Sequence, residues 1–118
     1  MKNKLLLFFA AIALIMTGCD KPSTAVKNFY NAMEDGNYEK AVTYTDTDEA
    51  EYKDMVAIMQ LLHLEITDYK IISEEKTSDT TAVVKTKVSW NINNEKMSDR
   101  EVKVVRKSGK WKVQGSVI

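Results

Sequence analysis

The spacing of apolar residues changes once along the chain, near residue 65, and this change restricts the fold more than any other feature. Before it, apolar residues recur every three or four positions, as on one side of a helix; after it, they recur every second position, as on one face of a strand. The longest alternating run predicts the clearest strand, with inward positions Ala82, Val84, Thr86, Val88, Trp90 and Ile92. Helices are therefore expected first, followed by antiparallel strands.

Three helices are predicted in the first half of the chain. Pro22 suits a first helical turn, and Gly36 suits the left-handed position that ends a helix. A shorter helix restarts at Asn37, and a third opens at Asp48, where Glu51 three residues on forms a capping-box pattern. The third helix is expected to end near Leu64. Its predicted inward positions are Tyr52, Val56, Met59 and either Leu62 or His63.

Four strands are predicted after residue 65. Tyr69, Ile71 and Ser73 mark the first, and residues 77–80 form the turn into the alternating run. A second turn is expected at 93–96, and a tight hairpin at 108–110. The last two strands carry Val102 and Val104, then Trp111, Val113, Gly115 and Val117. Because one face is apolar and the other rich in lysine, the helices must cover the apolar face. The prediction is an α+β fold in which about four curved antiparallel strands wrap around the long helix.

The N-terminus has the pattern of a lipoprotein export signal. Lys2 and Lys4 precede twelve apolar residues, too few for a membrane span of about 20 but suited to a signal peptide. Thr17 and Gly18 then lead into Cys19, the one cysteine of the chain, as in a bacterial lipobox. Residues 1–18 are predicted to be removed, 19–23 to form a lipidated tether and 24–118 to form the domain.

Lipidation of Cys19 has one alternative, an ordinary cleaved signal with an incidental thiol. Met16 stands where lipoboxes usually carry leucine, but the site also lacks an A-x-A-like cleavage pattern. With lipid on Cys19, the expected location is the bacterial cell envelope, anchored to a membrane in a leaflet that the sequence leaves open. The mature chain has 15 basic and 17 acidic residues, interleaved along the sequence. This pattern argues against a nucleic-acid partner, which needs a concentrated basic face.

Two motifs resemble a known family. The segment 25–33, followed by 35–41, is similar to the opening of small bacterial lipoproteins that carry a domain of unknown function. That domain belongs to the cystatin-like superfamily of nuclear transport factor and ketosteroid isomerase relatives. The segment 102–113, with its Gly-Lys-Trp-Lys-Val turn, resembles their final hairpin. The resemblance implies a cone-shaped interior that binds steroids, small apolar molecules or peptides in some relatives and is catalytic in a minority.

Candidate site residues follow from the aromatic and methionine content. Tyr30, Tyr52 and Trp90 could line the mouth of a ligand pocket with Met59 and His63, although the same residues suit a filled core. His63 has no sequence partner that would orient it as a base. The acidic run at residues 46–54 fits helix capping better than cation binding, because it lacks the EF-hand ligand pattern. We therefore expect no metal or other cofactor and no catalytic residue.

Two functions remain. The preferred one is a non-catalytic binding domain for an envelope protein, a peptide or a small apolar ligand, held at the membrane through Cys19. A sheet edge could also pair two copies into a homodimer. The alternative is a small isomerase or hydrolase of the ketosteroid isomerase type, with its chemistry inside the cone.

Overall fold

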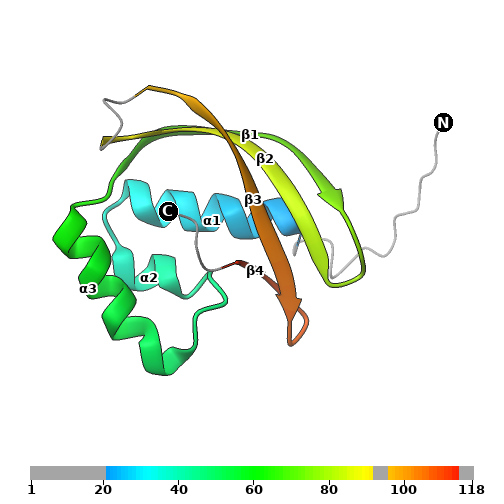
Figure 1. The fold of residues 1–118 in the computed structure, drawn as a ribbon, viewed down its shortest axis with the longest axis horizontal. Coiled ribbons are helices and arrows are strands. Elements are labelled where there is room, and N and C mark those ends of the chain that lie inside the picture. Colours follow the sequence, from blue (N-terminus) through cyan, green and yellow to red (C-terminus); the bar gives the residue numbers. More distant parts are fainter. Residues whose placement is uncertain (1–20, 92–95, 115–118) are drawn as a thin grey trace.

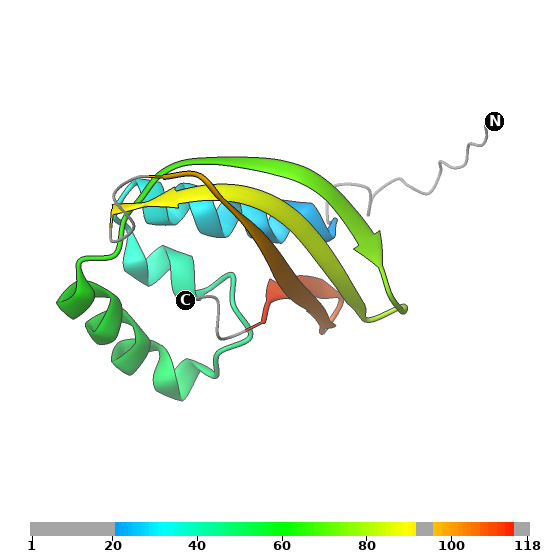
Figure 2. The same ribbon diagram turned by 45° about the horizontal axis from the view of Figure 1, so that its top comes forward.

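A four-stranded sheet bends over one long helix, and two shorter helices extend from the open side (Figures 1 and 2). The structure is a computed structural model that describes residues 21–91 and 96–114. The helical elements are α1 (Pro22–Glu34), α2 (Tyr38–Val42), the 3-10 turn η3 (Glu49–Glu51) and α3 (Tyr52–Leu62). The strands are β1 (Ile66–Lys76), β2 (Thr81–Trp90), β3 (Ser98–Lys107) and β4 (Lys110–Val113). The predicted α+β architecture is confirmed.

Helix α1 begins at Pro22 and ends just before Gly36, as the sequence predicted. Gly36 adopts φ +72° and donates its N–H to the Met33 carbonyl, which satisfies one of the last free carbonyls of the helix. The N-terminal end is stabilised by a distant residue, since the Ser23 N–H donates to a carboxylate oxygen of Glu74 on β1 at 2.9 Å. Helix α1 is thus fixed to the sheet at its first turn.

Helices α2 and α3 differ in how well the sequence predicted their starts. The Asn37 side chain accepts the Lys40 N–H at 3.1 Å and caps α2 as expected. The predicted capping box at Asp48 is wrong: Asp48 makes no side-chain cap, and the α-helix begins only at Tyr52. The first turn tightens into η3 instead, because the Glu51 N–H bonds the Asp48 backbone carbonyl at 2.8 Å.

The sheet is an antiparallel meander in the order β1-β2-β3-β4. Alternate residues of β2 face the helices and are buried, while Lys85 and Lys87 face outward. Register shifts in β1, one of them between Ile71 and Ser73, break its pairing with β2, and such irregularities increase the local bend of a sheet. Figure 2 shows the resulting curvature over α1. The predicted inward position Ile92, the turn residues 93–95, Gly115 and Val117 lie outside the described residues.

The β3–β4 hairpin has the two-residue turn that the sequence predicted. Lys107 pairs with Lys110, and the intervening Ser108 and Gly109 have φ values of +52° and +79°. Left-handed backbone at both positions is the geometry of a type I′ turn, which matches the twist of the paired strands. The hairpin places Trp111 inward, where it is 4% exposed, with the Lys76 and Arg106 side chains over its ring.

The core lies between α1 and the concave face of the sheet and contains Phe29, Met33 and Tyr30 among its most buried side chains. The Tyr30 hydroxyl lies 3.2 Å from the Thr86 hydroxyl, which donates to the Arg100 backbone carbonyl. Tyr30 must therefore be the donor to Thr86, because the single Thr86 proton is already used. Burial is the main cause of a raised pKa of Tyr30, which keeps its hydroxyl a neutral donor.

Candidate functional site

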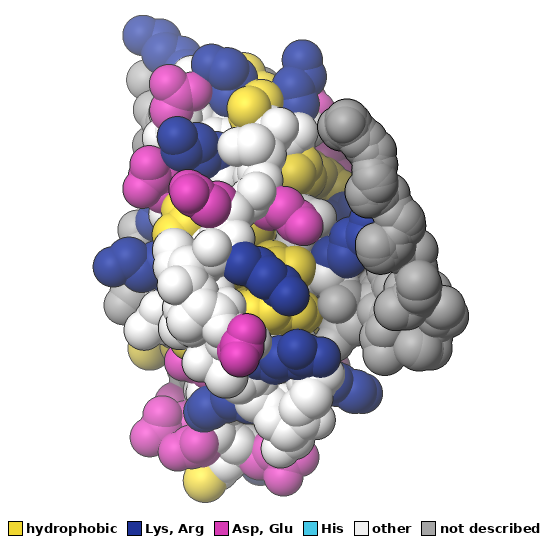
Figure 3. Space-filling model, turned by 90° about the vertical axis from the view of Figure 1, so that its right-hand side faces the viewer, with side chains coloured by type: hydrophobic (Ala, Val, Ile, Leu, Met, Phe, Trp, Pro, Cys, Tyr) yellow, Lys and Arg dark blue, Asp and Glu magenta, His cyan; other side chains and the backbone are white. Residues whose placement is uncertain are grey.

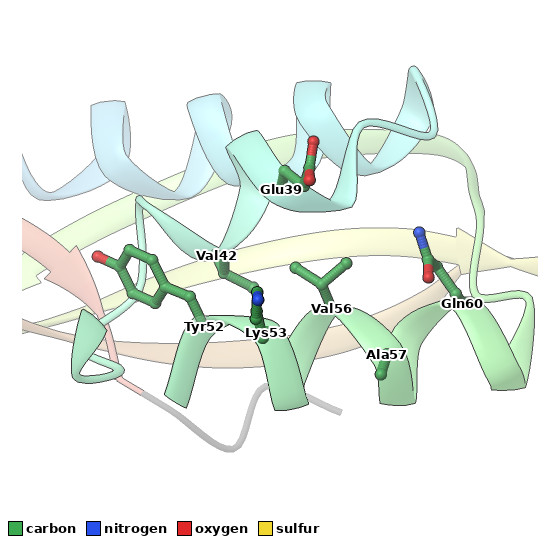
Figure 4. Close-up of a pocket in the computed structure, with 7 residues that line it drawn as sticks. All are labelled: Glu39, Val42, Tyr52, Lys53, Val56, Ala57 and Gln60. Carbon is green, nitrogen blue, oxygen red and sulfur yellow. The ribbon is translucent and has the colours of Figure 1, made fainter. Parts of the chain in front are cut away.

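A groove separates α2 from α3 on the side of the molecule away from the sheet. It has a volume of about 280 Å³ and is lined by Glu39, Val42, Tyr52, Lys53, Val56, Ala57 and Gln60. Val42 and Val56 point toward one another from the two facing helices (Figure 4). Glu39 and Gln60 place polar groups along the same walls. A small apolar groove with a few polar groups is the usual form of a binding site.

Hydrogen bonds at one end of the groove hold its two walls in place. The Tyr38 hydroxyl at the start of α2 donates to the Leu64 carbonyl just after α3, at 2.7 Å. The Asn91 side-chain amide donates to the His63 carbonyl at 2.6 Å, and its backbone N–H donates to the Glu65 carbonyl. Partial burial, and then the Glu65 charge, raises the pKa of Tyr38, so this donor remains protonated at neutral pH. At this end of the groove, α2 is therefore bonded to the residue that follows α3, and the residues after α3 are bonded to Asn91, just beyond β2.

Helix α3 exposes large apolar side chains beyond the groove. Ile58 is 49% exposed, Leu61 79% and Leu62 50%. Met59 is the one residue of α3 that is fully buried, because α3 packs mainly against α2 rather than beneath the sheet. The predicted inward position of Leu62 is therefore wrong. Three large aliphatic side chains in one exposed stretch of helix form the kind of surface that marks an interaction site.

Charge is segregated between the two halves of the molecule. Residues 34–68, which include α2, η3 and α3, contain ten acidic and two basic residues. The other described residues, at 21–33, 69–91 and 96–114, contain thirteen basic and five acidic residues. The expectation of interleaved charges was wrong, because one contiguous stretch of the sequence, residues 34–68, holds ten of the acidic residues and only two basic ones. The groove thus opens in a region with a formal net charge of −8.

The five predicted pocket residues occupy three different environments. Tyr30, Met59 and Trp90 belong to the core, with exposures of 2%, 1% and 5%. The Trp90 ring nitrogen is buried without a hydrogen-bond partner among the described residues. Tyr52 lines the α2–α3 groove, and His63 is exposed at the end of α3 with φ +50°. The structure does not bring these residues together around one cavity.

The buried polar groups of the described chain are the side chains of Thr45, Thr86 and Ser89, the Tyr30 hydroxyl and the Trp90 ring nitrogen, and burial raises the pKa of Tyr30. Within residues 21–91 and 96–114, no cluster of histidine, cysteine and carboxylate side chains has the arrangement of a metal site. Among the described residues, the α2–α3 groove is the candidate site, and it is lined by both apolar and polar side chains.

The family assignment agrees with this fold. Residues 21–116 match the model of the NTF2-like N-terminal transpeptidase domain. The chain belongs to this NTF2-like family. Its membership confirms the resemblance to the nuclear transport factor superfamily seen in the two sequence motifs.

Two solved structures are similar to the chain at low identity, and the first of them shares its fold. One is described as an NTF2-like transpeptidase from Campylobacter jejuni, with 18% identity, a TM-score of 0.51, and coverage of 80% of this chain and 97% of that one. A second is described as a calcium/calmodulin dependent protein kinase II association domain from Xanthomonas campestris, with 16% identity, a TM-score of 0.41 and coverage of 92% of each chain. No curated protein matches the chain.

Sequence reasoning missed the groove, although two of the predicted inward positions of α3, Tyr52 and Val56, line it. Helix α3 also carries Ile58 and Leu61 outside the predicted stripe of Tyr52, Val56, Met59 and either Leu62 or His63. An amphipathic helix needs one apolar stripe to pack on its own domain. Apolar residues outside that stripe therefore indicate a second surface that the domain itself does not cover.

Proposed function

We propose that this NTF2-like protein is a membrane-anchored lipoprotein of the bacterial cell envelope that binds a cationic, amphipathic segment of another protein in the α2–α3 groove. The observation that carries the proposal is the apolar groove and the exposed Leu61 beside it, both within the acidic half of the domain. The protein acts by holding its partner at the membrane and performs no chemistry on it.

The chemistry of the partner follows from the surface that it must cover. Val56 in the groove and Leu61 on the exposed part of α3 require apolar side chains opposite them, as in the helix-in-groove mode of peptide recognition. The groove wall carries Lys53 as well as Glu39, but the net charge of −8 over residues 34–68 favours Lys or Arg at the edges of the bound segment. A second copy of this domain is disfavoured as the occupant, because its own α2–α3 region would bring acidic residues against acidic residues.

A cone-pocket isomerase or hydrolase receives less support. Tyr30, Met59 and Trp90 fill the region where a pocket was predicted. The buried Tyr30 hydroxyl is an acid, but it donates to Thr86 within the filled core and has no cavity beside it for a substrate. These observations favour binding over catalysis.

The anchor is proposed from residues 1–19, which lie outside the described residues. Helix α1 begins at Pro22, so two of the residues that were predicted to form a tether are already in the helix. Among the described residues, no helix has the length and apolar character needed to cross a bilayer. A lipid on Cys19 would supply the attachment.

A defined peptide tests the groove. We expect an 18-residue helix with one Leu face and one Lys face to shift the backbone NMR signals of α2 and α3 in the mature chain. Leu61→Ser should weaken this binding about tenfold, since a buried leucine contributes roughly 1.5–3 kcal/mol. Ile72→Ser is the matched control, because Ile72 is also exposed, at 50%, but lies on β1. It should leave the affinity unchanged.

Charge provides the second arm of the experiment. A peptide with Glu in place of every Lys should bind at least tenfold more weakly, and Glu39→Lys should weaken binding of the Lys peptide more than Glu101→Lys on the sheet does. Signal shifts on the sheet instead of the helices would refute the proposal. So would self-association that Leu61→Ser abolishes, because the occupant would then be a second copy.

A further inference from the structure

We infer that the end of the domain next to the anchor rests on an anionic membrane surface, which turns the α2–α3 groove away from the bilayer. This membrane-facing end comprises the start of α1, the β1–β2 turn at residues 77–80 and the β3–β4 hairpin around Ser108 and Gly109. The inference rests on the anchor of the proposed function and adds to it an orientation and a lipid class.

The short connection to the anchor limits where the bilayer can lie. Three residue steps separate Cys19 from Pro22, and an extended chain spans at most about 3.6 Å per residue. Pro22, the first residue of α1, therefore lies within about 11 Å of Cys19, which carries the lipid in the proposed function. In Figure 1 this turn lies at the same end as the β1–β2 turn, whereas α3 lies at the opposite end.

The membrane-facing end carries an excess of exposed cations. Lys21 and Lys27 lie on or beside α1, and the turns add Lys76, Arg106, Lys107 and Lys110. The acidic residues there are Glu74, Glu75 and Asp79, and Glu74 already accepts the Ser23 N–H. Figure 3 shows Lys and Arg side chains over much of this end, with Asp and Glu between them. Clusters of this size beside an anchor are attracted to anionic lipid headgroups.

A hollow beside the anchor fits the chemistry of headgroup phosphates. It lies between α1 and β1, has a volume of about 720 Å³ and is lined in part by Lys21, Lys27 and Lys70. Tyr69 closes one wall, where its hydroxyl donates to the Asn31 side-chain oxygen at 2.5 Å. The hollow follows α1 to Glu34, the one carboxylate in its lining, so its three lysines leave an excess of positive charge for an anionic surface.

The acidic residues of the segment 34–68 favour the same orientation of the domain. Residues 34–68 have a formal net charge of −8, whereas the membrane-facing end has six basic and three acidic residues. A negatively charged bilayer attracts one end of this charge distribution and repels the other, within a screening length of about 10 Å at 0.1 M salt. Orientation and groove access are therefore coupled, since repulsion of α2 and α3 leaves the groove open to partners.

Paramagnetic NMR on nanodiscs tests the orientation. The mature chain is coupled through its Cys19 thiol to a maleimide lipid, so the result does not depend on cellular lipidation or on groove binding. With phosphatidylglycerol discs that contain a paramagnetic headgroup lipid, we expect amides at residues 77–80 and 107–110 to be broadened at least fivefold more than those of α3. Neutral phosphatidylcholine discs, or 0.5 M salt, should reduce this ratio to less than twofold.

Paired charge reversals supply the matched variants. Lys107→Glu with Lys110→Glu should abolish the preferential broadening in phosphatidylglycerol discs. Lys40→Glu with Lys53→Glu changes the net charge equally but lies on α2 and α3, and should preserve it. Equal broadening of both ends in anionic discs, or stronger broadening of α3, would overturn the inference. An unchanged ratio in neutral discs would also overturn it, because the tether alone would then set the orientation.

Discussion

Replacing Cys19 with serine is expected to remove fatty-acid labelling completely and to transfer the mature protein from the membrane fraction to the soluble fraction. Each buried methylene of an acyl chain contributes about 0.8 kcal/mol, and two or more chains anchor a protein stably while one holds it marginally. Loss of the thiol removes the site of the diacylglycerol, so no apolar group of that size remains. The measurements are incorporation of a clickable fatty acid and fractionation of the cells.

An uncleaved signal peptide could still hold the serine variant at the membrane, so a second version is needed. In it, an ordinary cleavable export signal replaces residues 1–19 and leaves Asp20 as the first residue. We expect this version to be soluble in the envelope and to keep its affinity for the Leu/Lys peptide. Membrane retention of a cleaved chain that carries no lipid would contradict the anchor.

Replacing Phe29 with alanine is expected to lower the free energy of unfolding by about 3–5 kcal/mol. Phe29 is fully buried on α1 and packs beside the Tyr30 ring at 6.0 Å between ring centres. A domain of this size has only about 5–15 kcal/mol of stability in total. The variant should therefore lose a large fraction of its stability and unfold at a clearly lower urea concentration, as measured by tryptophan fluorescence.

Ile72→Ala is the control for this prediction. Ile72 is a large aliphatic residue on β1, but half of its surface is exposed, so truncation leaves no closed cavity. It should change the stability by less than about 1 kcal/mol, as surface substitutions usually do. A loss below 1 kcal/mol for Phe29→Ala would mean that α1 does not pack against the sheet as described.

Local sequence patterns predicted the elements in which the spacing of apolar or turn residues matches the packing that the structure shows. The alternation from Ala82 to Trp90 predicted β2, because one face of that strand is buried throughout. The Ser108–Gly109 hairpin was predictable because its left-handed turn depends on few residues. The start of α3 was not, because the Asp48–Glu51 pattern also permits a 3-10 turn, and the packing of the preceding loop decides between them.

The candidate site depends on features that a linear pattern does not contain. Tyr30 and Trp90 could equally have lined a cavity or filled it, and only the packing of α1 against the sheet decides that they fill it. The groove depends on the distance between α2 and α3, which Tyr38 fixes through its bond to the Leu64 carbonyl. The charge separation, by contrast, is present in the sequence as the contiguous acidic stretch 34–68 and could have been predicted from it.

Site-specific photo-crosslinking in the living cell tests the central claim, groove binding, most directly. A photoreactive phenylalanine analogue at Leu61 should give a discrete adduct, and the crosslinked peptide of the partner should contain alternating apolar and Lys or Arg positions at helical spacing. The same analogue at Ile72, also exposed but on β1, should give none. Equal adducts from both positions, no adduct from Leu61, or attachment to an acidic segment would contradict the account.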